Sequence, residues 1–91
     1  MDTGDEKTAE DWTIQEVMEW IEKKRPGMLT EDDREAFLMN CINGETFLLD
    51  GNERFFKECG ILPGKAMTLA RWSRELAKKS KLLSFGVMHT T

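Results

Sequence analysis

The sequence predicts an all-α fold, a five-helix orthogonal bundle in which the last helix is the longest. Apolar residues recur at helical spacing along the chain, and pairs of turn-favouring residues separate the helical segments. With 91 residues and a hydrophobic content of 40%, the chain supports one small core and not two. A domain of this size leaves little room for a deep cleft, which favours surface recognition over catalysis.

The predicted domain begins after a charged leader. Residues 1–11 contain many charges and no large apolar side chain after Met1, so we expect a disordered leader there. The first helix is predicted over 13–24, because Thr13 and Glu16 have the spacing of a capping box. Its apolar side is supplied by Ile14, Val17, Trp20 and Ile21, and Pro26-Gly27 ends it.

The second helix is predicted over 30–40, because Thr30 can cap it and three acids in its first turn suit the positive end of the helix dipole. The spacing of these acids does not match a calcium loop. The pair Asn43-Gly44 is typical of hairpin turns, but its flanks have helical patterns, so we expect a turn between two helices. The apolar side of this helix is expected to comprise Ala36, Phe37, Leu38 and Cys41.

Two short helices and one long helix complete the bundle. The segment 45–49 is too apolar to be exposed on all sides, and the next helix is capped by Asn52 and stopped by Gly60. Another break is expected at Pro63-Gly64, before an amphipathic helix predicted over 65–81. The polar face of this last helix carries four cations in one stripe, Arg71, Arg74, Lys78 and Lys81.

The motifs along this chain together resemble those of the sterile alpha motif (SAM) domain. The run from Trp12 to Ile21 is similar to the family's opening signature of tryptophan, capping residue, valine and a second tryptophan. The resemblance implies a SAM-like domain over 12–81 that acts as a non-catalytic protein-interaction module. Its partner would be another SAM domain, either a second copy or a different one. The later residues that keep the family's register are Phe37, Ile42, Asn43-Gly44, Leu48-Leu49, Phe56, Gly60-Ile61 and Gly64.

Several positions depart from the family pattern. Trp20 and Phe37 are 17 residues apart, a few more than usual, and Asp33 replaces an aromatic residue. At three further positions a smaller residue replaces a larger one, so that part of the core must be filled from elsewhere. These positions are Gly51, Ala70 and Ser73.

The residues needed for catalysis or cofactor binding are missing or poorly placed. His89 is the single histidine and lies in the predicted tail, so no nucleophile in the folded segment has a histidine base. Cys41 and Cys59 lack the spacing of a metal site and are expected to be unpaired core thiols. No glycine pattern of a nucleotide site occurs. We therefore expect a protein that is not an enzyme and that holds no metal or cofactor.

Two features of the sequence guide the expected location of the protein in the cell. No apolar run approaches the ~20 residues that cross a bilayer, and the acidic N-terminus lacks the pattern of a signal peptide. We therefore expect an intracellular protein, cytoplasmic or nuclear.

Charge is distributed unevenly along the sequence. Residues 1–60 hold 16 acids and seven bases, whereas residues 61–91 hold one acid and six bases. Opposite charges on two different faces favour a head-to-tail contact, which forms an open filament when it repeats. SAM domains commonly associate in this way, through an acidic surface on the middle helices and the basic N-terminus of the last helix.

The resemblance thus implies two docking surfaces. On the acidic one, Phe55 has two interpretations: it is an exposed apolar anchor, or it fills the space left beside Gly51. The acidic surface is expected to comprise Asn43, Glu45, Asp50, Asn52, Glu53 and Phe55. The helix-five surface is expected to comprise Leu62, Pro63, Lys65 and Thr68.

Nucleic-acid binding is the alternative function. Some SAM domains bind RNA hairpins through basic residues near their last helix, and the stripe of four cations could contact phosphates in the same way. The net charge of −4 argues against it, and cations near a helix C-terminus also suit the dipole.

The segment 82–91 is too apolar for an ordinary solvated tail. Three interpretations remain: it packs back over Ala70 and Ser73, it is a docking peptide or membrane-surface anchor, or it marks a boundary inside a longer protein.

Overall fold

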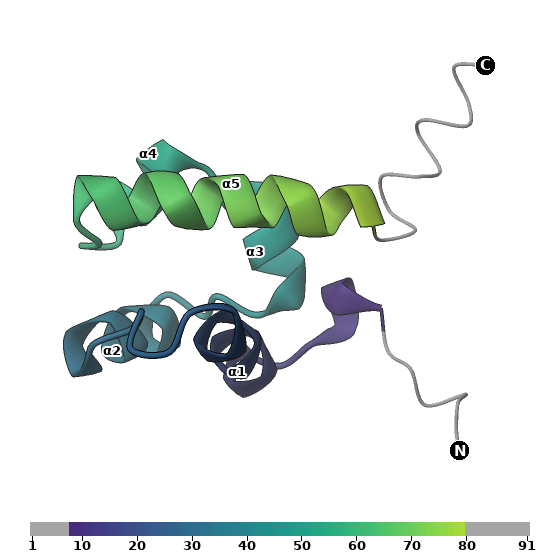
Figure 1. The fold of residues 1–91 in the computed structure, drawn as a ribbon, viewed down its shortest axis with the longest axis horizontal. Coiled ribbons are helices and arrows are strands. Elements are labelled where there is room, and N and C mark those ends of the chain that lie inside the picture. Colours follow the sequence, from purple (N-terminus) through teal and green to yellow (C-terminus); the bar gives the residue numbers. More distant parts are fainter. Residues whose placement is uncertain (1–7, 80–91) are drawn as a thin grey trace.

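A computed structural model describes residues 8–79, which form five α-helices after a short 3-10 helix (Figure 1). These elements are η2 (Ala9–Asp11), α1 (Ile14–Lys24), α2 (Glu31–Met39), α3 (Gly44–Asp50), α4 (Glu53–Glu58) and α5 (Pro63–Lys79). The described range contains no strand, which confirms the all-α prediction with its long last helix. Figure 1 shows α1 nearly end-on while α5 runs across the view, so the two helices cross steeply. The predicted tail and Lys81 lie outside the described residues.

The predicted capping box of the first helix is present, and the predicted cap Thr30 of the second helix also forms a capping box. The Thr13 hydroxyl accepts the Glu16 N–H at 3.1 Å, and the Glu16 carboxylate accepts the Thr13 N–H at 2.9 Å. Thr30 and Asp33 make the same exchange at 3.1 and 3.0 Å. Each box satisfies two N–H groups that the first turn of a helix leaves without an internal partner, and so sets where α1 and α2 begin.

The folded part of the chain begins earlier than predicted. Ala9 is buried, and the backbone N–H of Gly44 donates to the Trp12 carbonyl at 2.9 Å. A Cβ atom on Gly44 would overlap the carbonyl oxygen of Ala9, so glycine permits this close approach of η2 to α3. The expected disordered leader is therefore corrected for residues 9–11, while residues 1–7 lie outside the described range.

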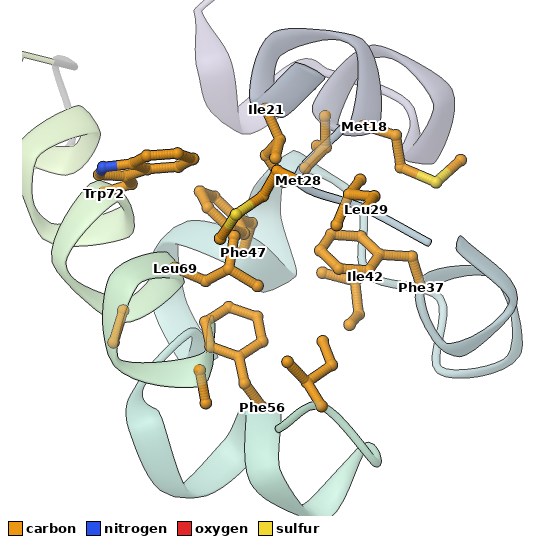
Figure 2. Packing of buried hydrophobic residues seen from close by; sticks show 14 residues of the cluster. Met18, Ile21, Met28, Leu29, Phe37, Ile42, Phe47, Phe56, Leu69 and Trp72 are labelled. Atoms are coloured by element: carbon orange, nitrogen blue, oxygen red, sulfur yellow. The ribbon is translucent and has the colours of Figure 1, made fainter. Parts of the chain in front are cut away.

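Three phenylalanines from three helices form the centre of the core. Phe37, Phe47 and Phe56 are fully buried, and the Phe56 ring centroid lies 5.8 Å from that of Phe47 and 6.4 Å from that of Phe37. Figure 2 shows Leu69 of α5 beside the rings of Phe47 and Phe56. Trp20 of α1 adds an edge contact to Phe47 at 6.1 Å. The phenylalanines thus join α2, α3 and α4 to one another, and Leu69 and Trp20 extend the cluster to α5 and α1.

Glu22 holds the long connection between α1 and α2 in place. Its carboxylate accepts the N–H groups of Gly27 and Leu29, both at 3.0 Å, and lies 3.6 Å from the Arg34 guanidinium. The backbone hydrogen bond from Gly27, then that from Leu29, lowers the pKa of Glu22 below its ordinary value of 4.5, with a smaller contribution from Arg34. This connection also buries Met28 and Leu29, which explains how the extra residues before Phe37 are accommodated.

We expect Glu22→Gln to lower the melting temperature at pH 7, because glutamine has one acceptor oxygen where glutamate has two. The pKa of Glu22 is lowered by folding, so its stabilisation is present above pH 4.5 and is lost as the pH falls through the folded value. The difference between variant and parent should therefore shrink in acid. Circular dichroism melts from pH 7 to pH 3 measure it, with exposed Glu35→Gln as the control. A constant difference across this range would contradict the assignment.

The end of α2 differs from the prediction. The helix ends at Met39, and Cys41 has a left-handed backbone with φ +52°. This turn brings Ile42 back into the core, where its N–H donates to the Phe37 carbonyl at 2.9 Å. Leu38 and Cys41 are exposed as a result, so their assignment to the core was wrong, because the apolar pattern did not show where the helix ends.

The last helix begins two residues before its predicted start. Pro63 opens α5, and the Leu62 carbonyl accepts the first helical bond from the Ala66 N–H at 2.8 Å. Proline is well tolerated at the first helical position because its missing N–H would have no helical partner there. The pair Pro63-Gly64 thus begins the helix and does not form a break before it.

Candidate protein-interaction surfaces

Two residues of the expected acidic surface serve as helix caps. The side chain of Asn43 accepts the Thr46 N–H at 3.0 Å at the start of α3. Asn52 likewise accepts the Phe55 N–H at 2.8 Å and caps α4, as predicted. Their side-chain oxygens are therefore engaged in local structure, which leaves the amide nitrogens for contact with a partner.

The acids of the middle helices have different surroundings. Glu45 and Asp50 are exposed on α3. On α4, Glu53 pairs with Lys57 at 3.5 Å, and Arg54 pairs with Glu58 at 3.6 Å. The two acids of α4 are thus balanced by two bases, and the negative character of this region comes chiefly from α3.

Phe55 contributes to packing more than to the surface. Its side chain is partly buried against the core cluster, and its ring centroid lies 5.5 Å from that of Phe56 in an edge arrangement. Phe55 is therefore not a fully exposed anchor, but the atoms nearest to a Cβ on Gly51 belong to Phe47, Phe56 and Ser73 and not to Phe55.

Lys65 is engaged within the domain. Its Nζ lies 2.7 Å from the Asp33 carboxylate, and the two side chains are 22% and 10% exposed. Partial burial raises the pKa of Asp33, but hydrogen bonds from Lys65 and Thr30 outweigh it and bring the pKa below 3.8. Asp33 thus completes the capping box of α2 and pairs with the cation that the sequence assigned to docking.

The exposed groups at the beginning of α5 are apolar. Leu62 is 68% exposed, and Met67, one turn further along, is 52% exposed. Thr68 donates its hydroxyl to the Gly64 carbonyl at 3.2 Å. Sequence reasoning missed Met67, although its position next to Ala66 and before Leu69 places it off the apolar face of the helix. With exposed Pro63, these side chains make a mainly apolar end surface.

The stripe of cations on which the alternative function depends is exposed where the structure describes it. Arg71, Arg74 and Lys78 lie on the outer face of α5. Arg74 also borders a shallow basin with two cations of α4, Arg54 and Lys57. Sequence reasoning missed this connection between the two helices, because residues so far apart in the chain are brought together only by folding.

The two cysteines differ in exposure, since Cys41 is exposed and Cys59 is half-buried. Cys41 and Cys59 are both free. Burial raises the pKa of the half-buried Cys59 thiol, and the Glu58 carboxylate adds to this, so the protonated thiol is favoured at neutral pH. Over residues 8–79 the structure contains no group of three histidine, cysteine or acidic side chains placed to hold a metal ion.

Two further findings concern the helices and the similarity of the chain to known proteins. Among the helices that the structure describes, none has the length and apolar character required to cross a membrane. Comparisons of the chain with family models, with curated proteins and with solved structures found no match.

Proposed function

We propose that this chain is a non-catalytic interaction module of the sterile alpha motif type, which associates head to tail with a second copy of itself. The support from the fold is that the residues carrying the family resemblance occupy structural positions. Phe37, Ile42, Phe56 and Ile61 are all buried, and Gly60 follows α4 with a φ of +101°. These buried members support the proposed register, whereas Leu49, which belongs to the same register, is 58% exposed.

The observation that carries the proposal is the exposure of Leu62 and Met67 at the beginning of α5. A large apolar side chain that is two thirds exposed gains hydrophobic free energy when a partner covers it. The first turn of α5 holds no acid, so its outward N–H groups keep their partial positive charge. This end of the helix therefore offers an apolar anchor within a weakly positive surround.

The complementary surface is the exposed acidic part of α3, Glu45 and Asp50. Figure 1 places α3 beside the middle of α5 and away from its N-terminal turn. Because the two surfaces differ and lie apart, a contact between them leaves one of each free on every pair. Association then continues into an open chain, with acidic groups of one copy facing the positive helix end of the next.

We expect Leu62→Asp, and separately the double variant Glu45→Lys with Asp50→Lys, to abolish self-association. Each change removes one of two unlike surfaces, so a mixture of the two variants should form a complex of two chains and nothing larger. Sedimentation velocity over a range of concentrations and salt measures this, and association should weaken at high salt.

Met39→Asp is the matched control, because Met39 is 75% exposed on α2 and belongs to neither surface. It should assemble as the parent does, and all variants should melt at the parent's temperature. Parent-like sedimentation of both surface variants would show that the surfaces are wrongly assigned. A parent that remains a monomer at every concentration would exclude self-association.

Nucleic-acid binding is a second candidate, supported by the three cations of α4 and α5 around one basin. Glu53 on the rim of the same basin weakens its positive potential, which makes it the less favoured function. An RNA hairpin whose binding falls steeply with salt and is lost in Arg71→Glu with Arg74→Glu would decide in its favour.

A further inference from the structure

An apolar groove lies between α3 and the C-terminal half of α5, away from the end surface at Leu62 and Met67. It encloses about 340 Å³. On its α3 side Leu49 is 58% exposed, although leucine side chains are usually buried in a domain of this kind. The residues that line the groove include Leu48, Leu49, Gly51, Ser73, Ala77 and Lys78.

The floor of the groove is formed by small residues, because the packing beneath it leaves no space for larger side chains. A Cβ atom on Gly51 would overlap the Phe47 carbonyl oxygen and come within 3.0 Å of the Phe56 ring. The buried Ser73 hydroxyl donates to that same Phe47 carbonyl at 2.6 Å, so it faces inward and not into the groove. Small residues are thus required at Gly51 and Ser73. The groove over them is open to an apolar group from elsewhere.

The chain itself supplies such a group immediately after the described residues. These end at Lys79, adjacent to Lys78 and close to Ala77, both of which line the groove. Five of the seven residues in 82–88 are large and apolar, namely Leu82, Leu83, Phe85, Val87 and Met88. We propose that the groove is the docking site of segment 82–88 of the same chain.

The lengths involved permit this contact. From Ser73 to Lys79 an α-helix rises about 9 Å, and seven extended residues span up to about 23 Å. A reversal at residues 80–81 therefore lets the segment return along α5 over the whole groove. In an extended segment Leu83, Phe85 and Val87 point to one side, which gives three apolar anchors for one apolar groove.

A segment joined to the groove has an advantage over any separate occupant. Its attachment holds it at a high effective concentration, of the order of millimolar, without loss of translational freedom. This inference does not depend on the proposed self-association, whose apolar contact lies at the opposite end of α5 and whose acidic groups, Glu45 and Asp50, do not line the groove.

The test is nuclear magnetic resonance of the full chain. We expect nuclear Overhauser effects between the Phe85 ring and the methyl groups of Leu48, Leu49 and Ala77. We expect Phe85→Ser and Leu49→Lys each to remove these effects and to lower the melting temperature by about 4–8 °C. The double variant should melt no lower than either single variant, since both break the same contact.

The surface control is Met39→Lys, which should keep the Overhauser effects and the parent's melting temperature. Absence of the Phe85 effects in the parent would overturn the proposal, and so would additive losses in the double variant. A sample that mixes isotope-labelled and unlabelled chains distinguishes Overhauser effects within one molecule from those between two molecules. Effects seen only between different molecules would show that the groove binds a second copy and would overturn the intramolecular contact.

Discussion

Phe47→Ala is expected to remove about 3–5 kcal/mol from the free energy of unfolding, the range found when a buried aromatic ring is truncated. The Phe47 ring is fully buried and its centroid lies near those of Trp20 and Phe56, so one change disrupts contacts among α1, α3 and α4. The backbone of Phe47 also accepts the Ser73 hydroxyl from α5. A domain of this size has about 4–11 kcal/mol in total, so the variant should lose much of its stability.

Urea denaturation followed by tryptophan fluorescence measures this loss, because Trp20 lies against the Phe47 ring. Met39→Ala, at an exposed position of α2, serves as the control and should change the free energy of unfolding by less than about 0.5 kcal/mol. A loss of under about 1 kcal/mol for Phe47→Ala would contradict the packing described for this ring.

Lys65→Glu is expected to destabilise the domain by about 2–3 kcal/mol at pH 7, because it places a second carboxylate beside that of Asp33. Removal of one partner from a fully buried pair costs about 3–5 kcal/mol, and the partial exposure of this pair reduces the effect. The double variant Lys65→Glu with Asp33→Asn should recover part of the loss, since the asparagine oxygen can still accept the Thr30 N–H at the start of α2 and adds no second negative charge.

The pH dependence of this pair has a definite sign. Folding lowers the pKa of Asp33 below 3.8, so its contribution is complete above that pH and is lost as the pH falls through the lower folded value. Lys65→Met should therefore flatten the fall in stability between neutral pH and about pH 3. Urea midpoints of parent and variant at several pH values measure this, and parallel curves would contradict the role of the pair.

The same ion pair changes how docking at the beginning of α5 should be tested. The sequence indicated Lys65 as the natural site for charge reversal, but in the structure that change removes a contact between α2 and α5. Loss of assembly in Lys65→Glu would then report on folding as much as on binding. Leu62 is the better probe, because its side chain is 68% exposed.

Local signals in the sequence determined the number of helices and most of their boundaries. Thr13 and Thr30 cap their helices through their own first turns, and Asn52 and Gly60 do the same at the two ends of α4. Such contacts span three or four residues, so the sequence contains all the partners that they need. The start of α5 was placed two residues late, because Pro63 both breaks a preceding segment and opens a following one.

The surface that each charged or apolar residue presents depended on partners distant in the sequence. Asp33 neutralises Lys65, the close approach of Ala9 is possible only at Gly44, and Cys41 is exposed by the turn that returns Ile42 to the core. The sequence by itself determined the helices, because their caps and apolar faces are local. Only the tertiary structure decided which side chains remain available to a partner, because burial and ion pairing depend on helices that meet after folding.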